Sequence, residues 1–139
     1  MLMNISLSSF LFVGVGGALG AMARFGLNLL SNNFLGMNIV GTFLANILGC
    51  LFVGAFIEFI YQLSLNSLDG TTFEQHRLLF AVGFCGSFTT LSALIFEINE
   101  LLHNNQLMYS FVYLICTLLG GFLFYWLGSI LIKYITFNI

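Results

Sequence analysis

The stretch GFCGSFTT, residues 83–90, places two glycines, a serine and two threonines inside a segment that is otherwise apolar enough to cross a membrane. Such residues are poor helix formers in the interior of a helix. In a bilayer, backbone that leaves the helix must be buried in protein or line a water-filled cavity. An interruption exposes carbonyl oxygens, which suit a cation, and N–H groups, which suit an anion. The stretch therefore predicts a helix break at an ion site.

A second candidate lies upstream, in NIVGTFLANILGCLFVGAFIE, residues 38–58. Polar or small residues recur there at intervals of four: Asn38, Thr42, Asn46, Cys50, Gly54 and Glu58. Positions four apart are neighbours on a helix, but each step drifts by about 40°, so the two ends of the stripe face different directions. Asn46 is the strongest candidate for an ion contact because it lies near mid-membrane with no charge nearby. The alternative is one interhelical hydrogen bond, worth about 1 kcal/mol.

The last apolar segment carries a similar stripe, in which Tyr113, Thr117 and Gly121 are again four apart. Hydroxyls down one face of an apolar helix suit a polar pathway, and they equally suit contacts between helices. Two such stripes and one break in a single chain favour an ion-conducting interior. The first segment contains GVGGALGAMAR, residues 14–24, whose small residues four apart favour close packing of two helices. Arg24 at its end faces a cavity or a partner, or reaches the lipid headgroups.

Four helices are needed to position these residues. The 139-residue chain is 60% hydrophobic and 6% charged, whereas soluble domains carry about 25% charged residues. A helix needs roughly 20 residues to cross a bilayer core of about 30 Å. Four stretches are long enough, at about 7–30, 36–61, 78–102 and 107–135. Polar links join them at 31–34, 62–77 and 103–106. We predict a single all-α membrane domain with four transmembrane helices, the third broken near mid-membrane.

Charge, cysteine placement and the motifs that are missing argue against nucleic-acid binding, enzyme activity and metal binding by cysteines. The net charge is −2 and the chain has three basic residues, whereas a nucleic-acid-binding surface needs clustered Lys and Arg. The chain has no Ser/His/Asp arrangement, no His/Cys cluster at metal-ligand spacing and no phosphate-binding glycine loop after a strand, so we predict that it is not an enzyme. The three cysteines lie inside apolar segments, where small buried hydrophobes are a better interpretation than disulfides or metal ligands.

Orientation in the membrane follows the Lys/Arg bias of short loops, which is weak here. With four spans, Arg77 and Lys133 fall on the side of the N-terminus, while Arg24 sits inside the first span towards its opposite end. The chain therefore inserts both ways round, or with its N-terminus inside and a small bias. The N-terminus lacks the basic region of a signal peptide, so the first apolar stretch is predicted to be retained.

Three motifs in order make the chain similar to the Fluc (CrcB) family of fluoride channels. GGALGAMAR resembles the family's glycine-rich first-helix motif ending in Arg, and GTFLANILG resembles its G-T-x-x-x-N-x-x-G motif. GFCGSFTTLS resembles its G-x-x-G-x-x-T-T-F-S break. The match covers nearly the whole chain. The resemblance implies a passive fluoride-selective channel in the cell inner (plasma) membrane that exports fluoride from the cytoplasm.

The resemblance also implies an antiparallel, dual-topology dimer whose two chains cross at their broken third helices. A structural sodium ion would lie at the crossing, held by backbone carbonyls that correspond here to Gly86 and Thr89. The implied partners are fluoride, membrane lipid, and either a second copy of the chain or a homologous second subunit.

The fluoride pathway that the resemblance implies is lined by Arg24, Asn46, Thr90, Ser92, Glu97, Tyr113 and Thr117. A third polar position on the last helix falls on Gly121, where the family has a serine. Amide and hydroxyl donors suit fluoride, because a pore must replace the ion's hydration shell and still release the ion, which a fixed positive charge would hinder.

The chain departs from the family pattern at two pore positions. The family continues T-T-F-S-T-F, with the positive ring edges of both phenylalanines facing the fluoride path, whereas this sequence reads TTLSAL with Leu91 and Leu94. Phe84, Phe88 and Phe96 flank the region but would need a changed register. The chain therefore pairs with a homologous subunit that supplies the rings, conducts through amide and hydroxyl contacts, or is an impaired, non-conducting member.

Two functions of other classes compete with the channel. A small proton-coupled exporter of cationic drugs also has four short spans, but it needs a carboxylate at mid-membrane. Glu58, Glu97 and Glu100 all lie towards the ends of their segments. A non-transporting assembly subunit would explain the glycine pairs but leaves the two polar stripes unexplained.

Overall fold

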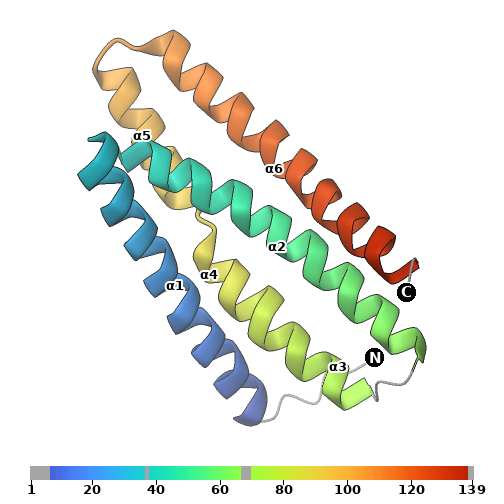
Figure 1. Ribbon diagram of the computed structural model, residues 1–139. Coiled ribbons are helices and arrows are strands. Elements are labelled where there is room, and N and C mark those ends of the chain that lie inside the picture. The colour runs from blue at the N-terminus through green and yellow to red at the C-terminus, as the bar shows by residue number, and fades with distance from the viewer. Residues whose placement is uncertain (1–6, 37, 67–69, 138–139) are drawn as a thin grey trace.

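A computed structural model describes residues 7–36, 38–66 and 70–137, and every regular element in those ranges is a helix (Figure 1). In chain order they are α1 (Leu7–Leu35), α2 (Asn38–Asn66), α3 (Gly70–His76), the π-helix η1 (Arg77–Cys85), α4 (Gly86–Phe88), α5 (Leu91–His103) and α6 (Leu107–Phe137). In the described ranges, four helical stretches are long and apolar enough to cross a membrane: Leu7–Phe34, Asn38–Leu63, Thr72–His103 and Leu107–Thr136. The predicted all-α membrane fold with four spans is confirmed.

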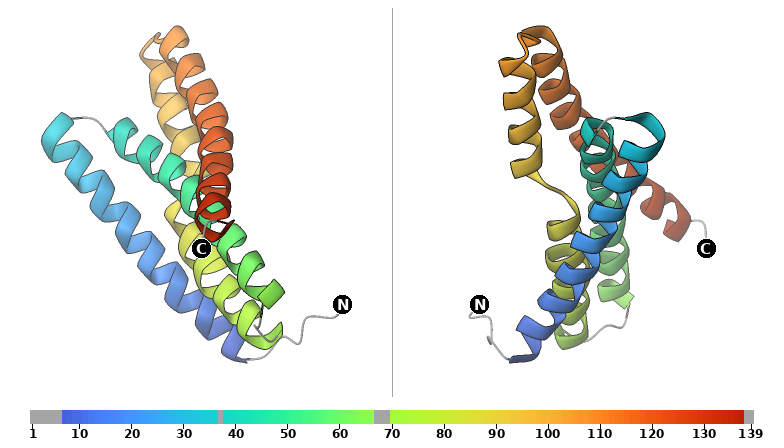
Figure 2. Two further views of the ribbon diagram at one scale, coloured as in Figure 1. Left: turned by 45° about the vertical axis from the view of Figure 1, so that its right-hand side comes forward. Right: turned by 90° about the vertical axis from the view of Figure 1, so that its left-hand side faces the viewer.

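The third span is broken, as predicted. Thr89 (φ −79°, ψ 154°) and Thr90 (φ −152°, ψ 118°) are extended, so the helix stops after α4 and resumes at α5. The interruption is visible as a thin connection between yellow α4 and the golden-orange α5 in Figures 1 and 2. Before the break, η1 is wound as a π-helix, which the sequence pattern did not predict. Such windings are rare and are frequently found at functional sites.

The third span changes neighbours at its break. Before the break, η1 and α4 pack along α1, and after it α5 packs on α6. Helix α2 contacts α1, α6 and both halves of the third span. The rotated views in Figure 2 show the two halves lying beside different helices. The break therefore lies against the helix that carries the stripe of Asn46.

Glycines bring α1 and η1 into backbone contact. A Cβ atom on Gly16 would overlap the Leu79 carbonyl oxygen, and one on Gly20 would overlap the Phe84 carbonyl oxygen. From the other side, a Cβ on Gly83 would lie 2.8 Å from the Val13 carbonyl oxygen. The small residues four apart in the first span thus work as the predicted packing motif.

Gly20→Ala is expected to destabilise the protein by about 1–3 kcal/mol, because the added methyl overlaps the backbone of η1 and forces the helices apart. Gly26→Ala is the matched control on the same helix, since nothing lies within 4 Å of its Cβ position. The stability of the control is expected to rise by up to about 1 kcal/mol, because alanine has a better helix propensity than glycine. Denaturant unfolding of the detergent-solubilised protein measures both; equal stability of the two variants would contradict the close α1–η1 contact.

A second glycine contact joins α2 to α6. A Cβ on Gly54 would overlap the Tyr125 carbonyl oxygen, and one on Gly128 would overlap that of Leu51. Large apolar side chains on the outward faces of all four spans are exposed, including Met22 on α1 and Phe122 on α6. Such a surface suits lipid or another membrane protein rather than water.

Two of the predicted links are largely helical. Residues 31–34 continue α1, which ends at Leu35; the next residue, Gly36, has φ +66° and donates its N–H to the Asn32 carbonyl at 2.9 Å. Glycine at positive φ is a common helix stop, so it outweighs the polar residues before it. The 62–77 link is also shorter than predicted, because α2 extends to Asn66 and α3 begins at Gly70.

The three cysteines are free thiols with different surroundings. Cys85 is buried and Cys50 is half-buried, but Cys116 is exposed on α6. The prediction of a buried small hydrophobe therefore holds for Cys85 and is wrong for Cys116, which faces outward from an apolar helix.

Candidate functional site

Asn46 supplies the missing backbone partner at the break. Its Oδ1 accepts the Thr90 N–H at 2.7 Å, and its Nδ2 donates to the Thr90 carbonyl at 3.2 Å. A side-chain amide has the same donor and acceptor as a peptide group, so it satisfies both groups of one extended residue. Asn46 is only 8% exposed, and its two bonds to Thr90 are partly buried.

Other polar groups at the break are paired by nearby backbone and side-chain groups. Thr89 donates both its N–H and its hydroxyl to the Cys85 carbonyl at 3.0 Å each. The Thr90 hydroxyl accepts the Ala93 N–H at 3.2 Å and so caps the start of α5. From α1, the Arg24 Nε donates to the Ser87 carbonyl at 3.2 Å.

The carbonyls of Gly86 and Thr89 lose their helical partners as a result. In a continuous helix they would accept from the N–H groups four residues later, those of Thr90 and Ala93. The Thr90 N–H donates to Asn46 instead, and the Ala93 N–H donates to the Thr90 hydroxyl. Two backbone oxygens, at the positions predicted for a cation, are left available. Among the described residues no group of three or more His, Cys, Asp or Glu side chains could hold a metal ion.

A groove of about 290 Å³ runs between α2, the break and α6. It brings together most of the predicted pathway positions: Asn46, Thr90, Leu91, Leu94, Thr117 and Gly121. Cys50 and Thr89 also line it, with Leu118 and Phe122 from α6. None of the lining residues carries a charge, so an ion in the groove would meet amide, hydroxyl and apolar groups.

Several of the hydroxyls at or near the groove are already engaged. Thr117 donates to the Tyr113 carbonyl of its own helix at 2.8 Å. The hydroxyls of Thr90 and Ser92 lie 3.0 Å apart and share a hydrogen bond. The Asn46 Nδ2 carries a second hydrogen that the bond to Thr90 does not use. An anion in this groove therefore has that hydrogen as a donor. The hydroxyls can also donate to it once they rotate out of their present hydrogen bonds.

Glu97 and Tyr113 belong to a separate buried cluster. The Thr42 hydroxyl donates to the Glu97 Oε1 at 2.6 Å, and the Tyr113 hydroxyl donates to its Oε2 at 2.6 Å. Glu97 is 6% exposed and Thr42 is fully buried. Neither Glu97 nor Tyr113 lines the groove, although the bond from Thr117 to the Tyr113 backbone joins the two regions along α6.

The winding stripe on α2 explains how Thr42 and its neighbours reach different partners. Thr42 faces Glu97 on α5, whereas Asn46, one turn later, faces the break. At the far end Glu58 accepts from Ser129 on α6 at 3.1 Å. The sequence signal for Thr42 was its place in the stripe; its partner was missed because spacing on one helix does not identify the helix it faces.

Arg24 and Ser92 lie outside the groove. The Arg24 guanidinium, half-buried, reaches the backbone of the third span through Ser87, and Ser92 is exposed beside Thr90. The predicted pathway residues thus fall into a groove set with Ser92 beside it, a carboxylate cluster and one arginine on α1.

The two leucines at the departed pore positions lie in different environments. Leu94 is 2% exposed and Leu91 is 67% exposed, although both line the groove. Phe84 stacks on buried Phe88 with ring centroids 5.6 Å apart. The aromatic ring that does line the groove belongs to Phe122, which the sequence pattern had not singled out.

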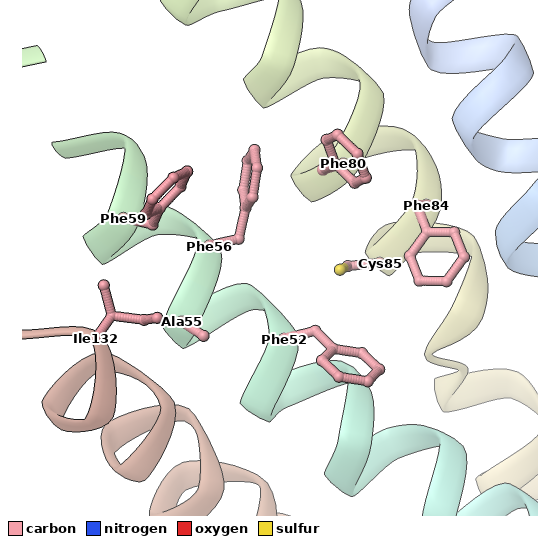
Figure 3. A pocket seen from close by; sticks show the side chains of 8 residues that line it. All are labelled: Phe52, Ala55, Phe56, Phe59, Phe80, Phe84, Cys85 and Ile132. Atoms are coloured by element: carbon pink, nitrogen blue, oxygen red, sulfur yellow. The ribbon is translucent and has the colours of Figure 1, made fainter. Parts of the chain in front are cut away.

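A larger pocket, about 470 Å³, is bounded by α2, η1 and α6 and is apolar (Figure 3). Its wall consists of Phe52, Ala55, Phe56, Phe59, Phe80, Phe84, Cys85 and Ile132. Figure 3 shows phenylalanine rings from α2 and η1 around the space, with the Cys85 thiol as the one sulfur-bearing group among the labelled side chains. These side chains offer no amide or hydroxyl to an ion.

Comparison with known proteins gives a consistent result. The family described as "CrcB-like protein, Camphor Resistance (CrcB)" matches residues 11–129. The chain is 41% identical to the fluoride-specific ion channel FluC of Chlorobium phaeobacteroides (strain DSM 266), over 96% of this chain and 98% of that protein. It is 39% identical to the FluC of Prosthecochloris aestuarii, over 91% and 94% of the two chains. It is 37% identical to that of Pasteurella multocida, over 89% and 92%.

Proposed function

The chain belongs to the CrcB family, and we propose that it is a fluoride-specific ion channel of the cell inner membrane, not an enzyme, through which fluoride leaves the cytoplasm passively. The observation that carries the proposal is the uncharged groove in which the Asn46 amide meets the break of the third span. Fluoride is compact and strongly hydrated, so it needs close donors, and it must also be released. Amide and hydroxyl groups meet both needs.

The fluoride pathway runs along this groove and continues to the carboxylate cluster. Asn46, Thr90 and Thr117 contact the ion first, and the Ser92 hydroxyl shares a hydrogen bond with that of Thr90. Tyr113 and Glu97 line the next part of the path. Arg24 on α1 acts on the path indirectly, through its bond to the Ser87 carbonyl of the third span. The uncharged lining supports this route, because a fixed cation there would bind fluoride too tightly to release it.

The working unit is an antiparallel dimer embedded in lipid, in which two chains inserted in opposite orientations cross at their breaks. The carbonyls of Gly86 and Thr89 from each chain would hold a sodium ion there, which would supply a fixed positive charge between the two breaks. The loss of their helical partners supports this arrangement. Two oxygens are too few to surround a cation, so the site is complete only with the second chain.

A partner-dependent or non-conducting subunit of a heterodimeric channel is the second candidate. It is favoured by the leucines at 91 and 94, and by the exposure of Leu91, which leaves that position free to meet another chain. The drug exporter has no comparable support, because Glu97 is buried with a hydroxyl donor on each oxygen.

Fluoride efflux from liposomes that contain this protein as the sole membrane protein tests the proposal. Rapid efflux, read with a fluoride electrode and absent for chloride, is expected of a working homodimer. Lack of efflux from folded, inserted protein, followed by efflux once a homologous subunit is added, would favour the heterodimer. Lack of efflux in both cases would contradict the channel.

Leu91→Phe with Leu94→Phe is expected to change the fluoride rate or its selectivity over chloride, because both positions line the groove. The ring edges would add weakly positive contacts that leucine methyls lack. The matched control is Ile95→Phe, at an exposed position on α5 that does not line the groove. Efflux and selectivity equal to wild type in the double variant would argue that positions 91 and 94 do not line the ion path.

A further inference from the structure

The two carbonyls assigned to the cation are available for a specific reason, which is that other groups have taken their helical partners. We propose that Asn46 is a positioning residue for the cation site: by accepting the Thr90 N–H, it prevents the helix from closing onto the Gly86 carbonyl and keeps that oxygen free for the ion. The inference rests on the proposed sodium site and adds to it the residue that holds the site open.

Geometry supports this role for Asn46. Its amide bonds both backbone groups of Thr90, at 2.7 and 3.2 Å, so it fixes the extended residue rather than touching it at one point. Three residues later on α2, a Cβ on Gly49 would overlap the Thr89 side chain. The glycine therefore lets α2 approach the break closely enough for the amide to reach it.

Removing the amide would leave the partly buried Thr90 N–H without its partner. A buried donor that loses its partner costs about 1–3 kcal/mol. The Gly86 carbonyl, four residues earlier, is the acceptor that an α-helix would supply. Closing this turn satisfies the N–H but removes a cation ligand, so the helix and the ion compete for one oxygen.

Thr90 plays the corresponding part for the second oxygen. Its hydroxyl accepts the Ala93 N–H at 3.2 Å, which would otherwise return to the Thr89 carbonyl. Asn46 and the Thr90 side chain thus each keep one carbonyl free. Asn46 also lines the groove, so one side chain connects the anion path to the cation site.

The test is the thermal unfolding midpoint of the full-length protein in detergent, measured in sodium chloride and in N-methyl-D-glucamine chloride. Wild-type protein is expected to be stabilised by sodium. Asn46→Leu is expected to lose this shift or to need at least about tenfold more sodium for it, the factor that corresponds to one hydrogen bond. Asn46→Asp keeps an acceptor for the Thr90 N–H and is expected to retain the shift.

Two further variants keep the test decisive if Asn46→Leu does not fold. Thr90→Val removes the cap on Ala93 and is expected to reduce the sodium shift. Thr117→Val, on the α6 wall of the groove, does not contact the break through its hydroxyl and is expected to keep the full shift. Wild-type shifts in Asn46→Leu, or in Thr90→Val if that is the variant that folds, would overturn the inference while leaving the sodium site intact. No sodium shift in wild type would instead remove the sodium site itself, and the inference with it, whereas fluoride efflux would still test the channel.

Discussion

Asn46→Leu is expected to abolish fluoride efflux, lowering its rate at least about a hundredfold. The substitution removes a donor to the ion, worth about 1.5–3 kcal/mol for a charged partner, and both bonds to Thr90, worth about 1 kcal/mol each. Leucine has the same branched arrangement of four side-chain heavy atoms as asparagine, so the substitution leaves no cavity and the loss is chemical. Efflux from liposomes, read with a fluoride electrode and normalised to inserted protein, measures the effect.

The matched control is Cys50→Ala, one turn further along the same face of α2. Cys50 lines the same groove, and in contrast to Asn46 its side chain is a free thiol. Its variant is expected to conduct within a few-fold of wild type, since a thiol is a weak donor. Unchanged efflux in Asn46→Leu would remove Asn46 from the fluoride path.

The break and the importance of Asn46 could each be predicted from the sequence because both signals are local, but their pairing with each other could not. Glycine, serine and threonine in an apolar span indicate a helix interruption, since the bilayer offers no water to pair the freed groups. A mid-membrane asparagine such as Asn46 needs a polar partner for the same reason. The prediction assigned Asn46 to the ion, whereas its nearest partners are the backbone groups of Thr90.

The pairing between helices could not be predicted. Arg24 reaches the Ser87 carbonyl and Thr42 reaches Glu97, across 63 and 55 residues of sequence. A stripe on one helix specifies a face but not the helix opposite it, and the stripe on α2 winds enough to meet several elements. The π-helix η1 adds to the difficulty, because its wider winding shifts the register of every later side chain in the span.

The end of α1 shows how one residue can outweigh several. The polar residues at 31–34 indicated a link, yet they remain helical until Gly36. Helix stops depend on backbone conformation at a single position, here φ +66°, and less on the polarity of the residues before it. The glycine pairs in α1 were informative for the same reason, because a missing Cβ has a direct geometric consequence.

Glu97→Leu is expected to destabilise the protein by about 2–5 kcal/mol and to reduce fluoride efflux. The carboxylate accepts the hydroxyls of Thr42 and Tyr113, both at 2.6 Å and both buried. Leucine accepts neither, and each buried hydroxyl left without a partner costs about 1–3 kcal/mol. Denaturant unfolding in detergent and liposome efflux measure the two effects separately.

Glu97→Gln separates the hydrogen bonds from the charge. Glutamine can accept from one hydroxyl through Oε1 and donate to the other through Nε2, because hydroxyls rotate to suit either role. Stability close to wild type and a modest change in efflux are therefore expected of a channel in which Glu97 organises α2, α5 and α6. Complete loss of transport in a stable Glu97→Gln protein would favour proton exchange at this carboxylate, as in a proton-coupled exporter, over a passive fluoride channel.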